Sequence, residues 1–575
     1  MKTVNLILLL ICFSYSIAVS AQKRVAISDF GVNEQTIDAT PGLIRALDKC
    51  KKSKASELIF EKGTYHFYPE NGTDKYCFVS NNDEGLKRIA FYLEGLDGLT
   101  IDGQGSQFIF HGFINPFVVE NSKRITFKNF SIDVNRPFHS EGIILANNPD
   151  GVDLEIPQNF PYKIHNGILV FTNNRESNKE KELIYPYGYL LEFDTEKRET
   201  AFMVHDYYLN DTPLRAEHIG ERKVRVFLDG LKGTVGNTLV FGTVKRHHPG
   251  FVISDTRDVL FDNITIHHAG GMGIIGQRAH NVTVTSCRVT PSEGRMISAT
   301  ADATHFTNCT GKIEISNCLF ENQMDDATNI HGIYVQIREI VSPNEVIVQL
   351  KHTQQLGFDF LKKGTSIEFV HAKSLITEGI SKVTAANRIN KELTRIRFAD
   401  PLPANIRVGD AIGEASDFAE VHIHNNYIGK NRARGMLLNC RAKTLVENNV
   451  FHSPGAAILF EGDASDWFEQ GGVKDCVIRN NVFDNCLFGV WGQAVIDVKA
   501  GITENREASR YNKNIQVYDN TFKLFDNMLL LHAYCMDNLR WENNTIERTE
   551  AYPSIRTEES YFKIENCSNM NIKQD

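Results

Sequence analysis

The chain has 575 residues, a net charge of −9 and an apolar fraction of 42%, which is ordinary for a globular protein. It contains no basic block, so neither nucleic acid nor an anionic membrane surface is expected as a partner. The length allows one large domain or several small ones.

The first residues predict a secretion signal. Residues 1–21 combine an early lysine, an apolar run and small residues before Gln22. Cleavage near Ala21 would leave a mature chain that is secreted or periplasmic, and the alternative interpretation of this segment is a buried first strand. No other stretch is long and apolar enough to span a bilayer.

The cysteines are scattered along the chain. One of the 11 lies in the predicted signal, and the others form neither a CxxC pair nor a dense framework. We expect buried free thiols rather than a disulfide scaffold or a zinc site.

A short strand pattern recurs, with a polar residue between two alternating apolar runs. The bend positions are Asn129, Asn263, Ser286, Asn317, Asn425, Asn448, Asn480, Asp519 and Asn543. Several neighbours are 23 or 24 residues apart, and a period of that length without helices predicts a parallel β-helix. Coils stacked about 4.8 Å apart would share one core. Asparagine amides could stack at each bend and satisfy turn backbone groups. An antiparallel β-sandwich is the alternative.

The mature chain begins with a segment that predicts a cap. Residues 22–136 would hold this cap and the first coils, and a helix from about Pro41 to Lys52 would cover the open end of the solenoid.

Two long gaps interrupt the repeat. They contain hairpin-like alternation and two mutually similar segments, which predicts two small antiparallel β-barrel-like insertions at 137–250 and 333–416. The remaining coils would occupy 251–332 and 417–575.

Three aspartates are spaced by one turn of this repeat. Asp302 precedes Asp325 and Asp326 by 23 and 24 residues, so the three carboxylates should converge on neighbouring coils. Asp325 and Asp326 can serve one site only if a bend or bulge interrupts the strand there.

Such a cluster suits glycoside hydrolysis. One acid would hold its proton through a raised pKa and protonate the leaving oxygen, while a charged partner activates water. One coil rise with a lateral offset gives a separation of roughly 6–9 Å, which favours inversion over retention. The alternatives are a solvated turn or a calcium site.

Segments in the same register should supply the rest of the pocket. The candidates for substrate binding are Gln277, Arg278, His305, Asn329, His331, Arg441, Glu461, Asp463 and Trp491. A tryptophan face suits the apolar side of a sugar ring, and arginine or asparagine suits its hydroxyls.

At these motifs the chain resembles two families. The N-terminal segment and the spacing of the aspartates resemble pectin-lyase-like right-handed parallel β-helices. The closer resemblance is to glycoside hydrolase family 110, the bacterial α-1,3-galactosidases, carried by "ADATHF" followed by "QMDDATNIHG". It implies that Asp325 is the general acid, that Asp302 and Asp326 position and activate water, and that the substrate is a terminal α-1,3-linked galactose of blood group B or linear α-Gal glycans. The absence of a clear Arg-x-Lys motif favours a neutral sugar.

The leading hypothesis is therefore an exo-acting inverting α-galactosidase with a glycan substrate and no cofactor or metal. One alternative is a polygalacturonase-like hydrolase or lyase acting on an acidic polysaccharide. The other is a non-enzymatic β-helical adhesin that binds carbohydrate. A homodimer formed through the insertions is left open.

Overall fold

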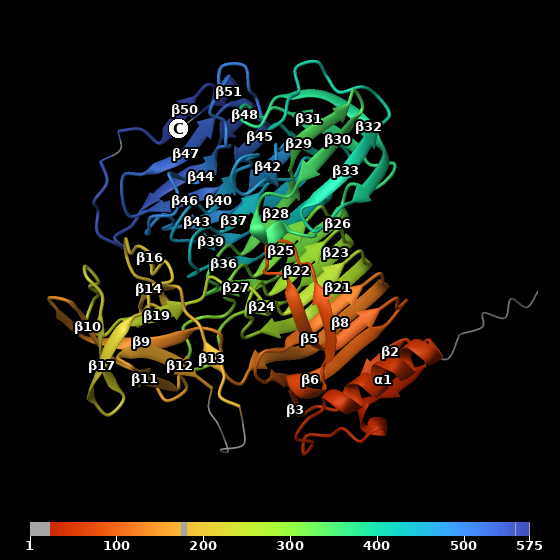
Figure 1. Cartoon of the computed structure of the whole chain (residues 1–575). Helices are drawn as coiled ribbons and strands as arrows, with labels where there is room; N and C mark the ends of the chain where they lie inside the picture. Colours follow the sequence, from red (N-terminus) through yellow and green to blue (C-terminus); the bar gives the residue numbers. More distant parts are fainter. Residues whose placement is uncertain (1–22, 174–180, 558, 574–575) are drawn as a thin grey trace, which may run out of the picture.

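The computed structural model describes residues 23–173, 181–557 and 559–573. The predicted signal at 1–21 lies outside these residues. The chain is a right-handed parallel β-helix that carries two antiparallel insertions, as the sequence predicts (Figure 1). Its coils contribute to two long sheets of 21 and 13 strands. None of the helices in the described ranges is long and apolar enough to cross a membrane.

Each coil near the middle of the solenoid contributes three strands. One coil holds β22 (Ile274–Gln277), β23 (His280–Thr285) and β24 (Arg288–Val289). The next holds β25 (Thr304–Thr307), β26 (Thr310–Ser316) and β27 (Leu319–Glu321). Each strand pairs in parallel with its counterpart one coil away, so residues at equivalent positions stack.

The predicted bends are turns in the left-handed region. All nine bend residues have φ between 54° and 59°, a conformation that asparagine tolerates better than most side chains. The stacked amides belong mainly to the following residue in the C-terminal coils. For example, Nδ2 of Asn449 donates to Oδ1 of Asn481 at 3.0 Å, and Nδ2 of Asn481 donates to Asn520 at 3.0 Å.

Apolar side chains stack in rows inside the solenoid. The rings of Phe117 and Phe251 lie 4.3 Å apart, and those of Phe483 and Phe522 lie 4.6 Å apart. The ten cysteines of the described residues are free and nine are buried, which confirms the expectation of buried thiols.

The predicted cap helix is present as α1 (Thr40–Ser53). Pro41 occupies its first turn, where a missing N–H costs nothing, and Lys54 ends it in the left-handed conformation. Its face of Leu43, Ala46, Leu47 and Cys50 joins the solenoid core.

The two insertions are antiparallel and lie on opposite sides of the solenoid in the view of Figure 1. The first is an eleven-stranded sheet that runs from β9 (Ser140–Asn148) to β19 (Thr238–Gly242). The second is a closed barrel of β29 (Val335–Ser342), β30 (Glu345–Gln349), β33 (Leu393–Phe398), β32 (Thr377–Arg388), β31 (Ser366–Val370) and β34 (Ala411–Glu414). Both sets of strands fall inside the ranges that the sequence predicts for the insertions.

Candidate active site

The three aspartates lie at the start of neighbouring strands. Asp302 lies just before β25, and Asp325 and Asp326 lie just before β28 (Thr328–Ile333). Thr304 pairs with Thr328, so Asp302 and Asp326 occupy equivalent positions one coil apart. The acidic pair lies in a bend before the strand, which frees both side chains to face one site. One turn of the solenoid therefore brings the three carboxylates together.

The nearest oxygens of the three carboxylates lie close to one another. One oxygen from each carboxylate lies within 4.8 Å of the others. The prediction of roughly 6–9 Å assumed a full coil rise plus an offset. That prediction concerns the separation of the whole carboxyl groups, which the distance between their nearest oxygens does not test, so inversion stays a prediction.

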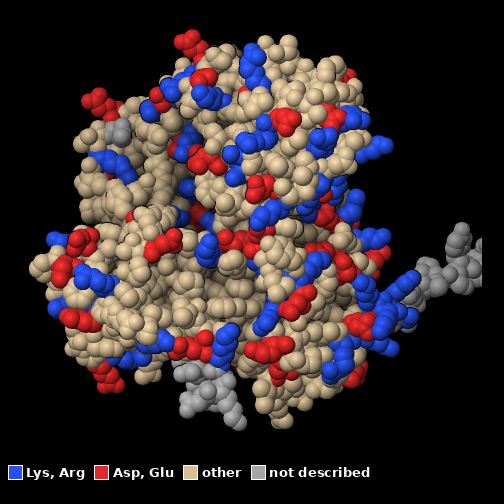
Figure 2. All heavy atoms as spheres, in the orientation of Figure 1, with Lys and Arg blue, Asp and Glu red and all other residues tan. Residues whose placement is uncertain are grey.

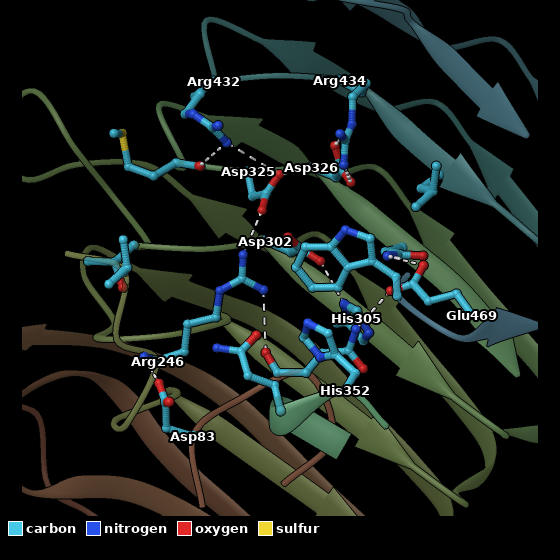
Figure 3. Close-up of a pocket in the computed structure, with 18 of the residues that line it drawn as sticks. Asp83, Arg246, Asp302, His305, Asp325, Asp326, His352, Arg432, Arg434 and Glu469 are labelled. Carbon is cyan, nitrogen blue, oxygen red and sulfur yellow. Dashed lines mark hydrogen bonds and ion pairs between the residues drawn. The ribbon is translucent and has the colours of Figure 1, made fainter. Parts of the chain in front are cut away.

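The carboxylates lie in a cavity of about 460 Å³ between the solenoid and both insertions (Figure 3). The first insertion and its flank supply Tyr189, Tyr208 and residues 243–246, the second supplies residues 352–354, and the early coils supply Asn81 and Asp83. The space-filling view shows acidic and basic side chains interspersed over this face (Figure 2).

Three arginines surround the acidic cluster. Arg434 makes a two-pronged contact with Asp326, with both N···O distances 2.8 Å. Arg246 donates to Asp325 at 2.8 Å, and Arg432 approaches the same carboxylate at 3.7 Å. These contacts compensate the repulsion between adjacent carboxylates.

The surroundings push the three carboxyl pKa values apart. Burial, followed by the charge of Asp325, raises the pKa of Asp302 well above its usual value. Burial also raises the pKa of Asp326 to about 8, in spite of Arg434. At Asp325 the three arginines outweigh burial and lower the pKa. The free protein therefore favours a charged Asp325 and protons on its neighbours, whereas a general acid needs a proton on Asp325. The role that the family resemblance implies for this residue stays a prediction.

Two buried histidines continue inward from the cluster. Nδ1 of His305 lies 2.6 Å from Oδ2 of Asp302, and Nε2 of His305 lies 2.9 Å from Nε2 of His331. Nε2 of His331 lies 3.5 Å from Glu469, and its Nδ1 lies 2.6 Å from the carbonyl oxygen of Gly332. Both ring nitrogens of each histidine have partners inside the protein, so His305 can hold the orientation of Asp302.

Of the predicted substrate-binding residues, some line the cavity and others do not. Those that line it are His305, Asn329, Glu461 and Asp463. Those outside the lining are Gln277, Arg278, His331, Arg441 and Trp491.

The residues outside the lining have structural partners. Gln277 accepts from the backbone of Ser80, and Arg278 pairs with Asp255 at 2.6 Å. Arg441 pairs with Glu368 of the barrel at 2.6 Å. Trp491 donates its indole N–H to Asp206 at 3.1 Å. Sugar contact by these residues stays a prediction. Bend register gives a residue's height along the solenoid, but not what covers it from outside.

Several lining residues escaped the sequence analysis, namely Asn81, Asp83, Tyr189, Tyr208, Arg246, His352, Arg432, Arg434, Trp467 and Glu469. A signal for one of them was present. Arg434 follows Asp326 by 108 residues, which is the offset from Asn317 to Asn425 across the second insertion. Arg246 and His352 belong to the inserted regions, for which the repeat has no register.

The acidic cluster has enough oxygen atoms to hold a cation. However, each carboxylate of the adjacent pair already contacts an arginine, and three guanidinium groups would repel a divalent ion. The donor set therefore does not fit the calcium site that the sequence left as an alternative. Glu314, His422 and His424 form a second group with metal-compatible spacing, outside the cavity lining.

Comparisons with known proteins agree with this arrangement. A model described as GLAA-B beta-barrel domain I matches residues 140–239, and one described as GLAA-B beta-barrel domain II matches residues 345–412. An alpha-1,3-galactosidase A of Shewanella woodyi is 35% identical over 97% of this chain and 91% of its own length. An alpha-1,3-galactosidase B of Bacteroides thetaiotaomicron is 31% identical over 100% of this chain and 94% of its own.

Among solved structures, a family 28 exopolygalacturonase of Yersinia enterocolitica aligns over 95% of this chain and 78% of its own, with 12% identity and a TM-score of 0.40. The two curated relatives match essentially the whole chain, including both insertions and the coils that carry the three aspartates. The chain therefore belongs to the α-1,3-galactosidases, glycoside hydrolase family 110.

Proposed function

We propose that the protein is a secreted or periplasmic exo-acting α-galactosidase that removes terminal α-1,3-linked galactose, with inversion, from blood group B or linear α-Gal glycans. The proposal rests on membership of the family together with one structural observation. This observation is the convergence of Asp302, Asp325 and Asp326 in a cavity of about 460 Å³.

The shape of the cavity supports attack at a chain end. Both insertions and an early coil contribute to its lining, so side chains from outside the solenoid border it on several sides. An internal sugar would need an open exit on each side, whereas a terminal sugar needs only one.

A homodimer joined through the insertions belongs to the same proposal, and size-exclusion chromatography tests it.

The chemistry needs two proton transfers. One carboxyl gives its proton to the glycosidic oxygen as the bond from that oxygen to the anomeric carbon breaks. A second carboxylate accepts a proton from the water that attacks the same carbon from the opposite face. The family resemblance implies that Asp325 is the general acid and that Asp302 and Asp326 position and activate the water.

The activity and its stereochemistry can be tested together. We expect galactose release from blood group B trisaccharide and from Gal-α-1,3-Gal, with the β-anomer appearing first in the NMR spectrum. Initial release of the α-anomer would contradict inversion. Release from neither substrate would contradict the proposed function.

Replacing single carboxylates distinguishes their roles. We expect Asp325→Asn to lower kcat on Gal-α-1,3-Gal by roughly 10³-fold, but to lower it much less on α-galactosyl fluoride, because fluoride leaves without being protonated. Asp302→Asn and Asp326→Asn should impair both substrates, because each removes part of the water-activating pair. Thermal melts of the three isosteric variants control for folding. If Asp325→Asn impairs both substrates equally, the general acid is another carboxyl of the cluster.

A further inference from the structure

The side chains that line the cavity differ between its floor and its opening. At its floor, Asp302 is 3% exposed and Asp326 is 1% exposed. Three apolar or aromatic side chains of the lining are far more accessible: Trp467 is 41% exposed, Tyr208 is 55% and Val244 is 49%. The acidic floor therefore leads outward to a rim that carries exposed apolar and aromatic side chains beside the polar Lys245 and Thr353.

Trp467 is held in place at this rim. It lies in the loop between β40 (Ile458–Phe460) and β41 (Glu469–Gln470). The carboxylate of Asp463 accepts hydrogen bonds from four backbone N–H groups of this loop, those of residues 465 to 468. The buried ring of Phe468 anchors the other end of the loop in an apolar cluster.

The second insertion supports the same indole from behind. The ring of His352 stacks on Trp467 with centroids 4.4 Å apart and an angle of 30° between the ring planes. Nε2 of Gln355 donates to the carbonyl oxygen of Trp467 at 2.9 Å. The loop thus presents a fixed aromatic surface that remains partly open to solvent, although its neighbour Phe468 is fully packed.

We propose that Trp467, backed by His352, is the binding surface for the sugar on the reducing side of the scissile bond. This inference rests on the proposed function, because it takes the terminal galactose to occupy the polar floor. The next pyranose ring then lies at the rim, where its C–H face can pack on the indole. Tyr208 and Val244 of the first insertion and its flank border the same mouth, so both insertions contribute to recognition of the aglycone.

The test compares two substrates that share galactose and differ in the group bonded to its anomeric carbon. Gal-α-1,3-Gal has a second sugar there, whereas α-galactosyl fluoride has none. We expect Trp467→Ala to lower kcat/KM for the disaccharide by about tenfold or more and to leave the fluoride within about twofold. Trp467→Phe should recover most of the loss, because it keeps an aromatic face. Tyr76→Ala is the matched control, since it removes an aromatic side chain that is 53% exposed but outside the cavity lining.

Two outcomes would overturn the inference. Equal losses on both substrates would mean that Trp467 acts through the loop or the floor of the site. An unchanged disaccharide rate would mean that the second sugar does not touch it. Wild-type protein inactive on both substrates would instead overturn the proposed function, and this inference with it.

Discussion

Asp302 and His305 face each other at a distance that suits a hydrogen bond with one hydrogen. Nδ1 of His331 faces the carbonyl oxygen of Gly332, so it carries a hydrogen, and Nε2 of a neutral His331 accepts from His305. This leaves Nδ1 of His305 facing Oδ2 of Asp302 at 2.6 Å with one hydrogen between them. Burial lowers the pKa of His305 to about 4 and raises that of Asp302, which places the proton on the carboxyl.

Replacement of His305 tests this arrangement. Glutamine can donate an amide hydrogen to a charged carboxylate, whereas Nδ1 of neutral His305 accepts from the carboxylic acid. We expect His305→Gln to move the limb of the kcat/KM pH profile that reports Asp302 toward lower pH, measured with Gal-α-1,3-Gal from about pH 4 to 8. A lower rate with both limbs unmoved would assign His305 a purely structural role. A melting curve shows whether the variant is folded.

At this scale the sequence predicts the acids better than their partners. The 23- and 24-residue spacings locate all three aspartates, because stacking on a solenoid follows directly from chain length. Arg246, a partner of Asp325, comes from an inserted region. The contact between His305 and Asp302 depends on side-chain directions within one coil. Arg246 lies in the predicted insertion, for which the repeat gives no register, and His305, expected to contact the sugar, faces Asp302 through Nδ1.

At each bend of this kind, one residue adopts the turn conformation and the next residue makes the hydrogen bonds between coils. In the coil around residue 480, Asn480 takes φ of 55°, while the amide of Asn481 is 1% exposed and bonds to coils on both sides. Asn481 also donates to the carbonyl oxygen of Val446 at 3.0 Å. The first residue sets the turn, and the second links neighbouring coils.

The two positions should therefore respond differently to substitution. We expect Asn481→Ala to destabilise the protein by about 3 kcal/mol, because it leaves several buried polar groups unpaired. Asn480→Gly is the matched control and should cost less than about 1 kcal/mol, because glycine adopts positive φ without strain. The midpoint of urea unfolding measures both. Equal effects would contradict the inference that Asn480 sets the turn and Asn481 links the coils.

The elements themselves are largely readable from the sequence. All nine predicted bends and the cap helix are present, because strand alternation and left-handed bends impose a short period on the residues. The loop from Asp463 to Phe468 is different. Its form depends on one carboxylate accepting from four backbone groups, and its exposure depends on His352, 115 residues earlier in the sequence.

On the scale of the whole molecule, the insertions wall the active site because charged contacts dock them on the solenoid. Arg432 pairs with Asp206 of the first insertion at 2.8 Å, and Arg441 pairs with Glu368 of the second at 2.6 Å. Trp491 and Arg441, two of the candidates for sugar binding, also make contacts of this kind. Sequence pattern predicts that each insertion is an antiparallel module, but these contacts join positions 73 to 285 residues apart and leave no local signal.

One docking contact should depend on pH. Nε2 of His452, in a C-terminal coil, lies 2.9 Å from Oε2 of Glu199 in the first insertion. Burial alone would lower the pKa of His452, but the hydrogen bond and the charge of Glu199 raise it above the ordinary value. The folded protein thus binds this proton more tightly than the unfolded chain does. The resulting stabilisation is complete below the unfolded pKa of about 6.5 and is lost as pH rises through the folded value.

We therefore expect the melting temperature of wild type to exceed that of His452→Gln by more at about pH 5.5 than at about pH 8.5. Glutamine keeps a neutral donor of similar reach, so the pH-dependent part of the difference isolates the charge on the imidazole. A parallel series with His165→Gln, a histidine on the first insertion at the end of β11 (Tyr162–His165), controls for general effects of losing a titratable ring. A wild-type advantage that is constant across this pH range would show that His452 docks the insertion in its neutral form.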